Sequence, residues 1–167
     1  AYAYRADTYR VLGEEEAAAD DLETALSLSP DNALIYSMRA RLQLQQGDQQ
    51  AALEDANYAI ELDPELGVAY FNRGVVYYID EYDLYAALSD YLQAIDLGFE
   101  TADVYNGIGR IYRLYGDYQQ AIENYESSIE LNPNFPYAYE NRGIAYSETG
   151  NYPRAIADFT RTIELNP

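Results

Sequence analysis

A spacing of 34 or 35 residues constrains this chain more than any other feature of its sequence. Five tyrosines recur at this spacing, each followed four residues later by alanine or glycine: Tyr2/Ala6, Tyr36/Ala40, Tyr70/Gly74, Tyr105/Gly109 and Tyr139/Gly143. A unit this short cannot bury its own apolar face, so successive copies must stack and share one core. The spacing therefore predicts a single solenoid domain with repeats at residues 1–31, 32–65, 66–100, 101–134 and 135–167.

Other positions keep the same register and predict two helices in each repeat. Glycine accepts the left-handed backbone of a turn between helices, as expected at Gly13, Gly47, Gly116 and Gly150. Proline cannot continue a helix, and it closes four of the units, at Pro30, Pro64, Pro133 and Pro167. Phe99 takes this place in the third unit, whose extra residue is expected near Asp80 to Tyr85.

The pattern resembles the tetratricopeptide repeat over essentially the whole chain. The family's helix-turn-helix consensus is filled at nearly every position in the fifth unit, by Tyr139, Asn141-Arg142-Gly143, Tyr146, Gly150-Asn151-Tyr152, Ala155-Ile156 and Leu165-Asn166-Pro167. The resemblance implies an all-α fold, a right-handed α-solenoid of five repeats with about ten antiparallel helices. Three arginines that follow the repeated tyrosine by three residues are expected to be structural braces: Arg39, Arg73 and Arg142.

Composition argues against several classes of function. The formal net charge is −19 and all ten basic residues are arginine, so a nucleic-acid partner is not expected. The chain contains no histidine and no cysteine, which removes the usual general base, the thiol nucleophile and the common zinc ligands. We therefore expect no enzyme, no cofactor and no metal site. No apolar stretch approaches the roughly 20 residues that span a bilayer, so membrane insertion is not expected either.

The family resemblance assigns partner binding to a concave groove lined by the first helix of each repeat. Asparagines there could hydrogen-bond the backbone of an extended peptide, arginines could hold its acidic side chains, and Phe71 with Tyr78 could form an apolar pocket. The candidate residues are Tyr4, Arg41, Phe71, Asn72, Val75, Tyr78, Asn106, Arg110, Arg113, Tyr137 and Asn141. The alternative interpretation is that the asparagines and arginines are ordinary exposed helix residues. The sequence favours a protein or peptide partner.

One well-known mode of the family is not matched. Repeats that grip the acidic C-termini of heat-shock chaperones carry basic residues at fixed groove positions. Here only Asn72, preceded by Arg41, approaches that pattern, and Asp103 and Gly107 stand where basic residues are required. We therefore expect an internal peptide segment or a folded partner rather than a chaperone C-terminal tail.

A second hypothesis is that copies of this chain associate head to tail into a filament or a larger repeat array. The last helix carries an apolar series with no capping helix after it, and the candidate residues at the two ends are Ala1, Thr8, Ile156, Phe159 and Ile163. Against this, Ala1 and Thr8 make a weaker apolar face than Ile35 and Leu42 of the second repeat. Because the first repeat begins inside its first helix, we also expect a piece of a longer or processed protein.

Overall fold

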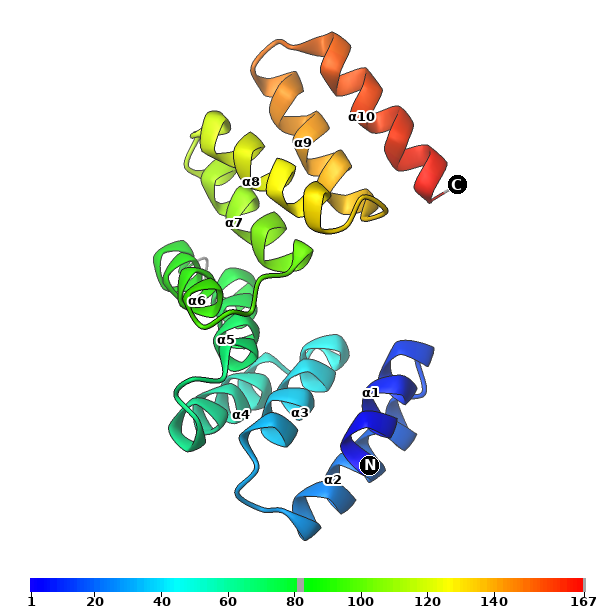
Figure 1. Cartoon of the computed structure of the whole chain (residues 1–167), viewed down its shortest axis with the longest axis vertical. Helices are drawn as coiled ribbons and strands as arrows, with labels where there is room; N and C mark the ends of the chain where they lie inside the picture. The colour runs from blue at the N-terminus through cyan, green and yellow to red at the C-terminus, as the bar shows by residue number, and fades with distance from the viewer. Residues whose placement is uncertain (81–82, 167) are drawn as a thin grey trace. The chain divides into compact units, whose positions relative to one another are not determined.

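Paired helices make up the fold, as the repeat pattern predicts. The computed structural model describes residues 1–80 and 83–166, and within them it contains ten α-helices and no strand (Figure 1). The helices are α1 (Tyr2–Leu12), α2 (Glu15–Leu28), α3 (Ala33–Gln46), α4 (Gln49–Leu62), α5 (Gly67–Asp80), α6 (Leu84–Asp96), α7 (Ala102–Leu114), α8 (Tyr118–Leu131), α9 (Pro136–Glu148) and α10 (Tyr152–Leu165). Each repeat holds one pair, which confirms the all-α solenoid of five helix-turn-helix repeats.

The helices group into two compact units. The first is Ala1–Phe99, with α1 to α6, and the second is Glu100–Pro167, with α7 to α10. Within each unit the two helices of a repeat pack against each other, and the second helix of a repeat packs against the first helix of the next. A single domain over residues 1–167 stays a prediction.

The predicted turn glycines end the first helices of four repeats. Gly47 follows α3 with φ 79° and its N–H donates to the Leu44 carbonyl, and the other three have the same left-handed backbone. Gly98, which was not predicted, takes φ 80° after α6, where Phe99 replaces the closing proline. The expected extra residue near Asp80 to Tyr85 falls partly on residues 81–82, and these, like Pro167, lie outside the described residues.

In four of the five repeats a small residue on the first helix faces a large residue on the second; the second repeat has alanine at both positions, Ala40 and Ala56. A Cβ added to Gly109 would lie 2.5 Å from the Tyr125 ring, and one added to Gly143 would lie 2.9 Å from the Phe159 ring. The first repeat carries alanine at this position and leucine opposite it, in Ala6 and Leu22, which share one core cluster. The two helices of a repeat therefore approach as closely as the volume of this pair allows.

Ion pairs join the two helices in four of the five repeats. Arg39 of α3 donates from Nε and a terminal nitrogen to both carboxylate oxygens of Asp55 on α4, at 2.6 and 2.7 Å. The same two-point contact recurs in three further pairs, Arg5/Asp21, Arg73/Asp90 and Arg142/Asp158. The structural role predicted for Arg39, Arg73 and Arg142 is thereby confirmed. The fourth repeat has Ile108 and Asn124 at the corresponding positions.

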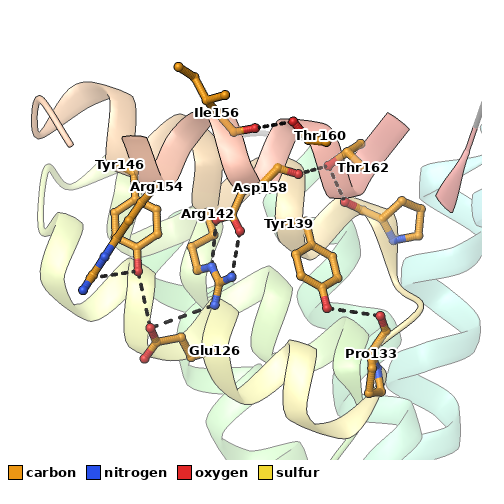
Figure 2. A network of polar contacts seen from close by, with 11 residues as sticks. Glu126, Pro133, Tyr139, Arg142, Tyr146, Arg154, Ile156, Asp158, Thr160 and Thr162 are labelled. Atoms are coloured by element: carbon orange, nitrogen blue, oxygen red, sulfur yellow. Dashed lines mark hydrogen bonds and ion pairs between the residues drawn. The ribbon is translucent and has the colours of Figure 1, made fainter. Parts of the chain in front are cut away.

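Aromatic rings and backbone carbonyls surround this ion pair in the fifth repeat. Figure 2 shows Arg142 of α9 reaching Asp158 on α10, with the Tyr139 hydroxyl donating to the Pro133 carbonyl. The Arg142 guanidinium also lies over the Tyr139 ring, 5.7 Å from its centroid. The repeated tyrosine thus supports the ion pair and fixes the preceding loop.

Candidate functional site

A cavity of about 480 Å³ in the second unit is the main candidate site. Asp103, Asn106, Arg110 and Arg113 are spaced three or four residues apart, which places them on one face of α7. The start of α9 supplies the opposite side. We call this site the α7–α9 groove; its lining is Asp103, Asn106, Arg110, Arg113, Phe135, Tyr137, Glu140 and Asn141. The structure thus brings together five residues predicted from the sequence.

Charges of both signs line the α7–α9 groove. Arg110 and Arg113 are half-buried, whereas Asp103 and Glu140 are exposed. The Nε–H of Arg113 is buried and has no hydrogen-bond partner. Such a groove can offer guanidinium donors to a carboxylate, while its exposed carboxylates can accept N–H groups of the same ligand.

Two asparagines of the predicted site link neighbouring repeats instead of pointing freely into a groove. Asn141 Nδ2 donates to Asn106 Oδ1 at 2.9 Å, from α9 to α7. In the first unit Asn72 Nδ2 donates to the carbonyl and the hydroxyl of Ser37 at 2.8 and 3.0 Å, from α5 to α3. Both links join residues 35 apart, so they are the same contact in two places.

Asn72 is the clearest correction to the predicted site. Its side chain is only 1% exposed, and its amide nitrogen is committed to Ser37. Its Oδ1 is buried as well and has no hydrogen-bond partner. The expectation that Asn72 presents its amide to a peptide backbone is therefore not met, because the neighbouring helix α3 covers it.

A smaller cavity in the first unit contains Arg41. It measures about 80 Å³, and α1, α3 and α5 line it with Asp7, Leu34, Ser37, Met38, Arg41, Val68 and Asn72. Arg41 is exposed, and Asp7 forms an ion pair with Arg10 at 2.8 Å. Tyr4 lies in a neighbouring cavity of about 230 Å³, which shares Leu34 with the first one. These residues form a second, more apolar surface on first helices.

The apolar pocket expected from Phe71 and Tyr78 is not found in either groove. The Phe71 ring lies 5.8 Å from the Tyr91 ring and 5.6 Å from the Phe99 ring, within its own repeat. Val75 and Tyr78 are half-buried on α5 and line neither the α7–α9 groove nor the Arg41 cavity. Phe71 therefore packs against Tyr91 of the second helix and Phe99 of the closing loop of its own repeat.

The residues predicted for self-association differ in exposure. Ile156 and Ile163 on α10 are 65% and 67% exposed, and Ala1 and Thr8 are exposed at the other end. Phe159 is half-buried because its ring packs over Gly143 of the same repeat. The expectation for Phe159 therefore changes: it fills the interior of the fifth repeat and presents only part of its ring.

Three lining residues of the main groove are not in the list of candidates named from the sequence: Asp103, Glu140 and Phe135. Phe135 precedes α9 as its N-cap residue, whereas the groove positions were mapped on helices alone. Its place directly before a first helix was the only available signal. Among the described residues no group of three acidic side chains could hold a metal ion, and no helix is long and apolar enough to cross a membrane.

Models of known protein families match most of this chain. A model described as "TPR repeat" matches residues 109–150, and two described as "Tetratricopeptide repeat" match residues 136–167 and 5–67. The chain is a tetratricopeptide repeat protein. The matched ranges leave out residues 68–108, which contain most of the third repeat with its extra residue and its phenylalanine in place of proline. No curated protein sequence matches this TPR chain significantly.

Solved structures support the same TPR assignment. MamA is 27% identical, with a TM-score of 0.73 over 96% of this chain and 93% of that one. A chain of the APC/C hetero-tetramer Cut9-Hcn1 is 20% identical, with a TM-score of 0.93 over 99% of this chain but 33% of that one. YrrB, described as a TPR protein with an unusual peptide-binding site, is 20% identical, with a TM-score of 0.67 over 99% and 85%. The last two show the fold alone.

Proposed function

We propose that this chain is a non-catalytic scaffold that binds an extended segment of a partner protein in the α7–α9 groove. The TPR fold mediates protein–protein interaction, which gives the general class of function. The observation that carries the finer proposal is the cavity of about 480 Å³, in which five residues chosen from the sequence line one surface. The absence of histidine and cysteine from the sequence supports a role without catalysis.

The two arginines of the groove favour a ligand segment that carries an acidic side chain. Arg110 and Arg113 lie one helical turn apart and can hold one carboxylate, or two neighbouring ones, through charge-assisted hydrogen bonds. Tyr137 is 57% exposed and offers its ring to an apolar side chain of the ligand. Asp103 and Glu140 can accept backbone N–H groups at the rim. The proposed ligand is therefore an extended peptide with an Asp or Glu beside an apolar residue.

A peptide-binding measurement with paired variants tests this proposal. The probes are short fluorescent peptides that carry Asp or Glu beside Leu or Phe, each with an Asn or Gln counterpart, and their affinity is measured by anisotropy. We expect the acidic peptides to bind, and Arg110→Ala with Arg113→Ala to weaken binding at least about ten-fold, because hydrogen bonds to charged groups contribute about 1.5–3 kcal/mol each.

Arg154→Ala with Arg161→Ala is the matched control. It removes the same charge from the same unit, and both side chains lie on α10, outside the groove lining. This control should bind like the unmodified chain. Equal binding by both double variants, or equal binding of acidic and amide peptides, would reject the α7–α9 groove as the site.

Self-association through the two ends is a second candidate function. The specific observation in its favour is the outer face of α10, where Tyr152, Ile156 and Ile163 are 63%, 65% and 67% exposed. These apolar side chains follow one face of the helix. Covering them would remove apolar surface from water and favour association.

A further inference from the structure

The exposed face of α10 repeats the face by which α8 binds α9. Residues 34 apart are identical or nearly so on the two helices: Tyr118/Tyr152, Ala121/Ala155, Ile122/Ile156, Tyr125/Phe159 and Ile129/Ile163. Of the α10 residues, Tyr152, Ile156 and Ile163 are exposed, Phe159 is half-buried and Ala155 is buried. On α8 these positions are buried or half-buried, and Tyr118 and Ile122 pack in one core cluster with Ala145 of α9. The α8–α9 contact therefore shows what kind of helix the face of α10 fits.

Two alanines allow α9 to approach α8 closely. Ala138 and Ala145 lie seven residues apart on α9, and both are 0% exposed. Ala145 lies in one core cluster with the buried Tyr125 of α8. A helix that docks on α10 in the same way should carry two small side chains seven residues apart.

Helix α1 together with its N-cap residue Ala1 carries this pattern. In the repeat register Ala1 corresponds to Ala138, Thr8 to Ala145, and Arg5 to Arg142. The first helices α3, α5 and α7 have at least one larger residue at the two small positions, as in Ile35 with Leu42 and Val104 with Ile111. Ala1 and Thr8 are exposed, and the Thr8 hydroxyl already donates to the Tyr4 carbonyl at 3.1 Å, so that its burial leaves no unpaired donor.

We propose that α10 of one copy binds α1 of a second copy, in the register by which α8 binds α9. This inference rests on the second candidate function and names its contact surfaces. The contact is heterologous, since two different faces meet, and each added copy leaves one free face at each end. Association therefore produces open chains whose length grows with protein concentration.

Charge opposes this contact and gives it a recognisable salt dependence. The chain carries a net charge of −19; residues 1–32 contribute −6 and residues 136–167 contribute −1. Copies therefore repel one another at low ionic strength. Added salt shortens the range of this repulsion to about 10 Å at 0.1 M and strengthens apolar association relative to it. We expect association to increase with salt.

Sedimentation velocity on single variants and their mixture tests the proposal. The unmodified chain should form species whose mass rises with concentration and with salt. Ile156→Glu places a charge on the α10 face, and Thr8→Glu places one on the α1 face, so each variant alone should remain monomeric. An equimolar mixture should form dimers and nothing larger, because only one intact face of each kind remains.

Ala157→Glu is the matched control on α10. This residue is exposed on another side of the helix, and the corresponding residue of α8 is Glu123, so the variant should associate like the unmodified chain. Circular dichroism verifies that all variants are folded. The proposal is overturned if the unmodified chain stays monomeric, if Ile156→Glu still associates, or if the mixture gives no dimer. Peptide affinity of the monomeric variants is measured separately and reports on the groove alone.

Discussion

At the residue scale, glycine and tyrosine side by side set the distance between the helices of a repeat. Gly109 has no side chain, and the Tyr125 ring occupies the space that its Cβ would take, 2.5 Å away. Tyr125 is itself 0% exposed. Where the large residue is smaller, as at Leu22, alanine replaces glycine in Ala6. In these repeats the volumes of the two side chains are therefore matched.

The close packing of Gly109 against the Tyr125 ring predicts that Gly109→Ala destabilises the fold. Alanine favours helices over glycine by about 1 kcal/mol, but overpacking against Tyr125 costs about 1–3 kcal/mol, so the net effect should be a loss. Tyr125→Leu should also destabilise, because it leaves a cavity. The double variant reproduces the Ala6/Leu22 pair. Its loss of unfolding free energy should be about 1 kcal/mol smaller than the sum of the losses of the two single variants. Urea unfolding measures all three; additive losses would show that the two positions are not packed against each other.

At the element scale, the arginine–aspartate pairs hold the two helices of a repeat together. Each aspartate is 6% exposed, and its two oxygens accept hydrogen bonds from one guanidinium. Hydrogen bonding from Arg5 holds the pKa of the Asp21 carboxyl below its ordinary value. The ion pair between α1 and α2 therefore depends on Asp21 being ionised.

We expect Arg5→Gln to destabilise the fold at neutral pH, and the loss to shrink as the solution is acidified. Because the pKa of Asp21 is lower in the folded chain, its contribution is present above its unfolded pKa of about 4 and fades as pH falls through the folded value. The difference in unfolding free energy should thus be constant from about pH 7 to pH 5 and decrease below about pH 4.

Arg154→Gln is the control for this experiment, because Arg154 bonds the Tyr146 hydroxyl rather than an aspartate. The difference in unfolding free energy between Arg154→Gln and the unmodified chain should not follow the titration of Asp21. If the difference in unfolding free energy between Arg5→Gln and the unmodified chain stays constant down to pH 3, or increases there, the role assigned to the ion pair is contradicted.

Periodicity predicted the elements of this molecule well but placed side chains less reliably. The spacing of the repeated tyrosines and of turn glycines such as Gly47 gave five helix pairs, because helix formation and termination are local. Whether Asn72 faces a ligand depends on Ser37, which is 35 residues away and belongs to another repeat. Phe71 turns toward Tyr91 and Phe99 for a similar reason. Phe135 lies before the first residue of α9, so the helical periodicity could not predict that it lines the groove.

The whole molecule uses one kind of packing for two purposes. Second helices such as α8 bury their outer face under the next repeat, and α10 presents the same face to solvent. First helices such as α7 leave a groove that carries arginine in a chain with a net charge of −19. The groove and the end face therefore lie on different elements, and each can be changed without changing the other.

The most direct test of the proposed function is to locate a bound peptide on the folded chain. Amide ¹H–¹⁵N shifts are followed while an acidic peptide selected by the anisotropy measurement is added to the Ile156→Glu variant, which should remain monomeric. The account predicts shift changes concentrated on α7 and the start of α9, with side-chain signals of Arg110 and Arg113 among the largest. Changes confined to α8 and α10, with α7 unaffected, would contradict it.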